Sequence, residues 1–187
     1  MPDSLSTRRQ ALEDRFFKDE EAKQISHLRD KLAAQKNREE LAEVCGIEDP
    51  TVLDTLTKLD VGAHDVSALT LVPLVEVAWA DGSMSKEERA AILKAAIAQG
   101  VKDESHSHEL LDAWLTQRPS KDLFQAWIGY VNAVRPLVSE DEMTALKESI
   151  LGLAHDVASA AGGYLGIGTV SSAEKNVLTA IGAAFDG

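Results

Sequence analysis

Residues 75–93 read VEVAWADGSMSKEERAAIL, and this stretch predicts the fold class of the chain. Its first half is apolar enough for a buried helix, and Asp81 followed by Gly82 signals the turn that ends it. Ser85, with Glu88 three residues later, is a capping box that begins a second helix. The stretch is therefore typical of a helical hairpin, which is a helix, a short turn and a capped helix.

The same signals recur along the rest of the chain. Ser139 with Glu142, and Ser171 with Glu174, are further capping boxes and predict two more helix starts. From residue 66 onward, hydrophobic residues recur every three or four positions, and no stretch alternates apolar and polar residues as strands do. We expect an all-α protein, a helical bundle of about seven helices with two pseudo-repeated helical hairpins.

Composition and charge restrict the classes of partner. The chain has 187 residues, 44% of them hydrophobic, as expected of one compact unit. Thirty-one acidic and nineteen basic side chains give a net charge of −12. This charge disfavours nucleic acid, because a phosphate-binding surface needs concentrated Lys and Arg, and it favours cations or basic protein patches. The single cysteine, Cys45, excludes an internal disulfide and a multi-cysteine zinc site.

We expect neither a targeting signal nor a membrane-spanning segment in this sequence. The N-terminal basic pair is not followed by a long apolar core, so no secretory signal is expected. The longest mostly apolar run, residues 68–80, contains Pro73 and Glu76 and is too short to cross a bilayer. We therefore expect a cytoplasmic protein with no transmembrane segment.

Charged side chains are concentrated in the first third of the chain. Residues 1–60 carry 24 of the 50 charged side chains, which predicts a charged helical arm before an all-α domain over residues 61–187. Near the end of the arm, Asp49 followed by Pro50 predicts the start of a short helix, because proline loses no hydrogen bond at the first helical position. We expect Gly62 to close that helix.

The earlier part of the arm has the spacing of a long helix with few apolar residues. Ile25, Leu28 and Leu32 recur at helical intervals, and one or two helices are expected to end near Gly46. Such a helix is only marginally stable alone, so it should pack on the domain or on a partner.

An internal repeat links the two predicted hairpins. Residues 77–82, VAWADG, match residues 157–162, VASAAG, and each copy is followed by a capping box and an amphipathic helix. The copies differ in the turn, which is two residues long in the first copy and eight residues long and rich in glycine in the second. Ala161 stands in the second copy where the first has Asp81.

These residues resemble a known family. The stretch VEVAWADGSMSKEERAAIL is similar to the signature of the TerB-like family, named for tellurite resistance, in which Ala-Asp-Gly, then Ser, then Glu lie between two helices. AAGGYLGIGTVSSAEKNVL, residues 160–178, resembles the C-terminal half of that family, so the resemblance covers about residues 65–187. It implies a compact bundle of two similar halves, no catalysis, and roles in stress response, metal-linked signalling and membrane-proximal assemblies.

The resemblance also implies a metal site. Family members are proposed to bind a divalent metal through acidic residues, which correspond here to Asp81 and Glu88. In the second copy only Glu174 is retained, so a symmetric site with two halves is not expected. A complete calcium loop is excluded, because Val77 and Trp79 occupy positions that would need oxygen ligands.

The same two carboxylates have a structural explanation that needs no ligand. Glu88 closes a capping box, and Asp81 lies near the positive N-terminal end of the following helix. This explanation is the stronger of the two, because capping accounts for both residues.

No other group of residues forms a clear site. Residues 106–108, His-Ser-His, are the only histidine cluster, and a polar loop explains them better than a metal site that lacks further ligands. Trp79, Trp114 and Trp127 lie on apolar helical faces and are expected in the core. Cys45 has no histidine nearby and there is no serine elbow, so we expect a protein that is not an enzyme.

Two hypotheses for the function follow. In the first, a divalent cation binds at Asp81 and Glu88 and biases a helical hairpin that a protein partner senses. In the second, the chain is a metal-free protein–protein adaptor that docks on its partner through the arm, residues 1–45.

Overall fold

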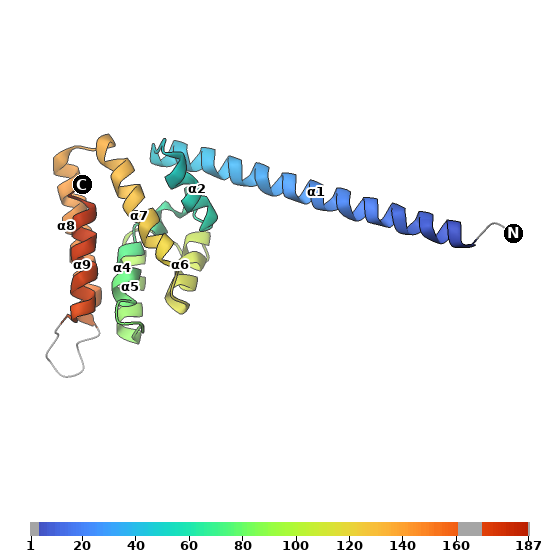
Figure 1. The fold of residues 1–187 in the computed structure, drawn as a ribbon. Coiled ribbons are helices and arrows are strands. Elements are labelled where there is room, and N and C mark those ends of the chain that lie inside the picture. Colours follow the sequence, from blue (N-terminus) through green and yellow to red (C-terminus); the bar gives the residue numbers. More distant parts are fainter. Residues whose placement is uncertain (1–3, 161–169, 187) are drawn as a thin grey trace.

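The computed structural model describes residues 4–160 and 170–186, and every regular element in these residues is a helix. The described residues form nine α-helices, seven of which begin after residue 60, so the all-α prediction is confirmed (Figure 1). The elements are α1 (Ser4–Cys45), α2 (Pro50–Lys58), the 3-10 helix η1 (Ala63–Asp65), α3 (Val66–Leu69), α4 (Val72–Ala78), α5 (Lys86–Ala98), α6 (His106–Thr116), α7 (Lys121–Val134), the 3-10 helix η2 (Arg135–Leu137), α8 (Glu140–Ala160) and α9 (Ser172–Ala184).

Helix α4 is the centre of the core. Six of its seven residues are buried, and α5, α7, α8 and α9 all pack against it. Pro73 lies in its first turn, where a missing N–H is not needed. The continuous apolar run that includes α4 is therefore explained by burial on every side.

The three tryptophans contribute to the core as expected. Trp127 on α7 is fully buried, with its ring stacked on Phe124 at 5.5 Å and edge-on to Phe185 at 5.8 Å. Trp114 is also buried, and half-buried Trp79 donates its indole N–H to the Trp114 carbonyl at 2.9 Å. These contacts connect the first hairpin to α6 and join α7 to the C-terminal end of α9.

The predicted hairpins are both present and lie against each other. The first is α4 and α5, and the second is α8 and α9, with α8 packed on both helices of the first hairpin. The second helices are equally long, at thirteen residues, whereas α4 has seven residues and α8 has twenty-one. The glycine-rich connection of the second hairpin falls within residues 161–169, outside the described residues.

The end of α2 differs from the prediction. Asp49 caps α2 by accepting the Thr51 N–H at 2.8 Å, as expected. However, the residue that turns the chain is Asp60, with φ of +59°, and not Gly62, whose φ is −109°. Aspartate tolerates the left-handed conformation that ends a helix, and this reduces the need for glycine.

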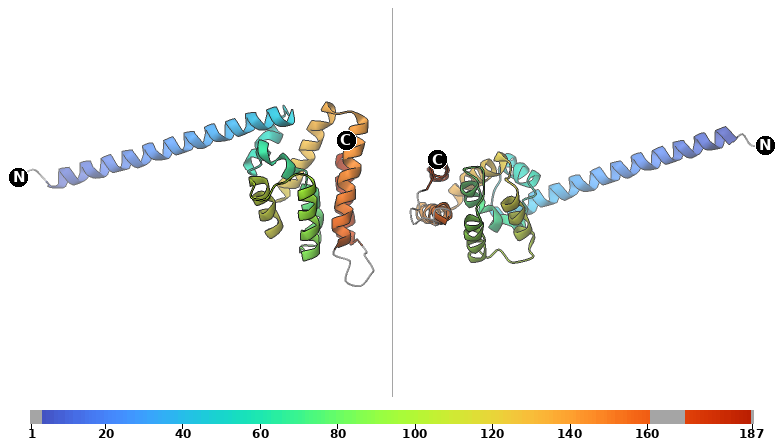
Figure 2. Two further views of the ribbon diagram at one scale, coloured as in Figure 1. Left: turned by 180° about the vertical axis from the view of Figure 1, so that it is seen from behind. Right: turned by 90° about the horizontal axis from the view of Figure 1, so that it is seen from below.

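Helix α1 is a single helix that leaves the body of the molecule (Figures 1 and 2). Among the described side chains of α1, those that pack on the body lie in its C-terminal part: Leu41 is fully buried, and Arg38 pairs with Asp54 of α2 at 2.8 Å. Gly46, with φ of +68°, ends the helix as predicted. Its N-terminal part points away from the core in all three views, and side chains 22–36 are all exposed.

Candidate functional site

The first candidate site is the turn between α4 and α5, which carries both predicted metal ligands. Asp81 is exposed, and its Oδ1 accepts the Ser83 N–H at 2.9 Å and the Ser83 hydroxyl at 3.1 Å. Gly82 has a φ of +93°, a backbone conformation that favours glycine. The carboxylate of Asp81 therefore stabilises its own turn.

Glu88 performs the capping role that the sequence predicts. It is 5% exposed, and its Oε2 accepts the backbone N–H and the hydroxyl of Ser85 at 2.8 and 2.7 Å. In return, the Glu88 N–H donates to the Ser85 hydroxyl at 3.1 Å. This capping box is one of three, because Ser139 with Glu142 and Ser171 with Glu174 have the same reciprocal bonds.

The geometry at this turn accounts for both carboxylates by local hydrogen bonds. Among the described residues there is no group of three or more His, Cys, Asp or Glu side chains that could hold a metal ion. Glu76 lies on α4 and is partly buried, and it pairs with Arg118 at 3.5 Å, a partner that spacing along the sequence does not indicate. Cation binding at Asp81 and Glu88 stays a prediction.

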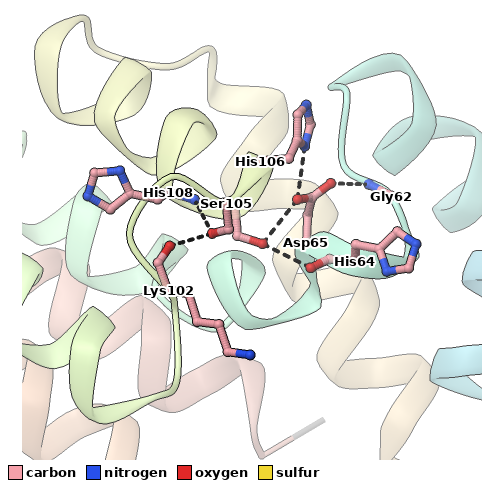
Figure 3. A network of polar contacts seen from close by, with 8 residues as sticks. Gly62, His64, Asp65, Lys102, Ser105, His106 and His108 are labelled. Carbon is pink, nitrogen blue, oxygen red and sulfur yellow. Dashed lines mark hydrogen bonds and ion pairs between the residues drawn. The ribbon is translucent and has the colours of Figure 1, made fainter.

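A second cluster surrounds Asp65, which sequence reasoning missed (Figure 3). Asp65 is 3% exposed, and its Oδ2 accepts the Gly62 N–H at 3.0 Å. Its Oδ1 lies 3.0 Å from Nδ1 of His106 and 3.1 Å from the hydroxyl of Ser107. The hydroxyl is also 2.9 Å from the His64 carbonyl oxygen. This cluster joins η1 to the first turn of α6.

The Asp65 cluster has the geometry of a structural hydrogen-bond network and lacks the geometry of a Ser–His–Asp catalytic triad. Ser107 and His106 both bond to the same carboxylate oxygen, so the hydroxyl is directed at Asp65 and the His64 carbonyl. A nucleophilic serine needs its proton directed at a base that is itself oriented by a third group. The arrangement can instead hold α6 against η1, since a buried carboxylate is stabilised by several donors.

The contacts with Asp65 also raise the pKa of His106. The hydrogen bond that the His106 ring donates to Asp65, with the attraction of the Asp65 charge, raises the pKa of His106 above the ordinary value of 6.5. Glu109 and Asp60 add to this effect, and partial burial opposes it. The sequence predicted a polar loop at residues 106–108. In the structure these residues begin α6, and His106 and Ser107 bond to the buried carboxylate of Asp65.

Cys45 has no feature of a reactive nucleophile. The side chain is half-buried against the core, and burial raises the pKa of its thiol. A raised pKa reduces the thiolate fraction, which is the nucleophilic form.

The third candidate is the exposed face of α1. Ile25, Leu28 and Leu32 are 43%, 59% and 65% exposed. At 100° per residue, these three positions lie within an arc of about 60° on one side of the helix. We call these three residues the arm stripe. The pattern was visible in the sequence, but its exposure could be known only once α1 was seen to leave the body.

No protein-family model matches the chain, and neither the curated proteins nor the solved structures contain a match. The resemblance to the TerB-like family therefore stays an expectation based on the residues quoted above. In the part of the chain that the structure describes, no helix is long and apolar enough to cross a membrane.

Proposed function

We propose that this chain is a non-enzymatic protein-interaction module that docks through α1. The observation that carries the proposal is the arm stripe, three large aliphatic side chains exposed on one face of a helix that projects from the body. Single exposed hydrophobic residues are common, but a row of them on an exposed stretch of helix favours an interaction surface.

The energetics of a long isolated helix support the same proposal. Most helical stability in proteins comes from the packing of an apolar face, and intrinsic propensity contributes less. Side chains 22–36 of α1 are all exposed, so the body gives them little packing. A partner that covers the arm stripe would supply the missing contacts, and each fully buried leucine would contribute roughly 1.5–3 kcal/mol.

The carboxylates of the other two candidate sites already have structural roles within the chain, which leaves the arm stripe as the better candidate for binding a partner. Glu88 and Asp81 bond within their own turn, and Asp65 bonds to three groups of the body. The arm stripe is the candidate whose side chains have no comparable structural role among the described contacts.

Site-specific crosslinking in cells tests the proposal. A photoreactive amino acid at Leu28 should yield covalent adducts with protein on irradiation. The same amino acid at exposed Ala34, on the opposite side of α1 from the arm stripe, should yield few or none. Equal labelling at both positions, or no adduct at either, would contradict docking through the stripe.

A further inference from the structure

The charge reverses sharply between the middle of α1 and the residues at and just after its C-terminal end. Residues 22–38 contain five basic side chains and one acidic side chain, a net charge of +4 in a protein whose net charge is −12. The next ten residues, 39–48, contain four glutamates and no basic residue, a net charge of −4. The arm stripe lies within the basic segment, so any surface that covers it should be acidic and apolar.

A groove with these properties lies at the base of α1. It has a volume of about 490 Å³ and is formed where the end of α1 meets the start of α2. Exposed Glu39, Glu43 and Glu48 give it acidic edges, and the small residues Ala42 and Gly46 leave room between them. We call this the root groove.

Exposed apolar surface continues beside the root groove. Leu137 of η2 is 55% exposed, and a Cβ atom at Gly46 would lie 3.0 Å from its Cδ1. An aliphatic side chain that entered the groove near Gly46 would therefore also contact Leu137.

We propose that the arm stripe of one chain docks in the root groove of a second copy, and that two copies form an antiparallel, two-fold symmetric dimer through α1. This inference rests on the proposed function, because it identifies the partner of the same exposed face. Under two-fold symmetry each contact occurs twice, once for each stripe and groove.

The register follows from size and from charge. In an antiparallel pair centred on residue 37, Leu28 lies opposite Gly46 and Leu32 lies opposite Ala42, so large side chains meet small ones. Arg29 of one copy is then level with Cys45 of the other, on the same side of the pair as Glu43, which lies two residues along the helix and within reach of the long arginine side chain. Lys36 lies near the symmetry axis, where its own i+4 neighbour Glu40 holds it at 3.3 Å.

Parallel pairing gives the opposite electrostatic result. It would place the basic segment beside the basic segment and the acidic segment beside the acidic segment, and like charges at a shared face are destabilising. An antiparallel pair centred on the arm stripe itself would also bring the two basic segments together. Only an antiparallel register near residue 37 matches each segment with its opposite.

Sedimentation equilibrium of the full chain and a charge-exchange series test the proposal. The full chain should form a reversible dimer, and Arg29→Glu or Glu43→Arg alone should raise the dissociation constant at least about tenfold, because each change puts like charges together twice. Combining both changes in one chain should restore the dimer. Mixing the two single variants should also restore it, because a pair of unlike variants has complementary charges at both contacts.

The controls separate this inference from the proposed function. Both substituted residues are exposed, so unchanged helix content and unfolding midpoints should show that the fold is intact. Lys23→Glu, an exposed charge reversal on the side of α1 opposite the arm stripe, should change the dissociation constant much less.

Three outcomes would overturn the proposed dimer. The full chain could stay monomeric up to high micromolar concentration, or it could form a dimer whose dissociation constant neither single variant changes. The third outcome is a double variant that does not recover the dimer. If Leu28 crosslinks to a different protein, or to a vesicle of anionic phospholipid in a parallel assay, while the chain is monomeric, the second copy is excluded as the partner. Crosslinking to a different protein leaves the proposed function standing, and no protein adduct at all removes both.

Discussion

At the scale of single residues, Asp65 organises the most buried polar contacts described for this protein. It is almost inaccessible to solvent, and its three donors come from Gly62, His106 and Ser107. Burial of a carboxylate is costly unless the charge is well bonded, so these donors are needed for the carboxylate to be tolerated. The cluster therefore locks a short 3-10 helix to the beginning of α6.

The raised pKa of His106 predicts a pH-dependent stability. Because the folded pKa lies above the unfolded value of about 6.5, this contribution is complete below pH 6.5 and is lost as the pH rises through the folded pKa. His106→Gln should therefore lower the free energy of unfolding at pH 6 and have less effect at pH 8. The His106 side chain is 60% exposed, so screening should keep the difference below about 1 kcal/mol.

Denaturant unfolding at several pH values measures this effect. His64→Gln is the matched control, because the cluster uses the backbone carbonyl of His64 and not its ring. If both variants changed the pH profile equally, the hydrogen bond between His106 and Asp65 would not be its source.

Asp65 also illustrates what the sequence could not reveal. The capping residues are three apart and follow a local rule, so Ser85 and Glu88 were recognisable as a pair. Asp65 and His106 are 41 residues apart, and only tertiary packing brings them together. Without the fold, the residues around His106 read as an isolated polar segment.

At the scale of elements, the α4–α5 turn allows a direct test of cation binding. If a divalent cation binds Asp81 and Glu88, millimolar Ca²⁺, Mn²⁺ or Zn²⁺ should raise the melting temperature, because a ligand that binds only the folded state stabilises it. Asp81→Ala should abolish the shift. Differential scanning calorimetry with and without each ion measures it.

Because Glu88 also caps α5, the effect of replacing it on stability must be separated from any effect on cation binding. The capping box of Ser139 and Glu142 provides the control. Glu88→Ala and Glu142→Ala each remove one capping box, and each should destabilise the protein by about 1 kcal/mol or less. Only the first should remove an ion-dependent shift. No shift with any ion in the unaltered chain would exclude a cation site there.

Helix starts were more predictable than helix ends. All three capping boxes form as expected because the residues that satisfy the first N–H groups lie within the same turn. The predicted end of α2 was wrong. Aspartate and glycine can both adopt the left-handed conformation that ends a helix, and the sequence has Asp60 and Gly62 close together, so the pattern did not distinguish them.

At the scale of the molecule, the charged arm divides into a packed part and a free part near residue 37. Removal of residues 1–35 should therefore leave the remaining fold intact, since Leu41 and the Arg38–Asp54 pair are retained. Thermal unfolding should change little, and the truncated chain should lose the α1-dependent crosslinks and the dimer. A large loss of stability would mean that the free part of α1 packs on the body.

Much of this organisation was predictable from composition. A high density of charge with few apolar residues indicated a long arm, and dense helical periodicity indicated a compact bundle. The root groove could not be predicted, because it forms where the ends of α1 and α2 meet in space. The charge reversal was present in the sequence, but it indicates an antiparallel pairing only once the position of the root groove is known.

The projecting helix also determines how the protein fills space in solution. A compact chain of this length would have a radius of gyration of about 16 Å. A rod of 42 residues at 1.5 Å per residue is roughly 63 Å long, and it leaves the body at one end. The N-terminal end of α1 is thereby held tens of ångströms from the bundle, so a single chain in solution should have a radius of gyration clearly above that of a compact chain.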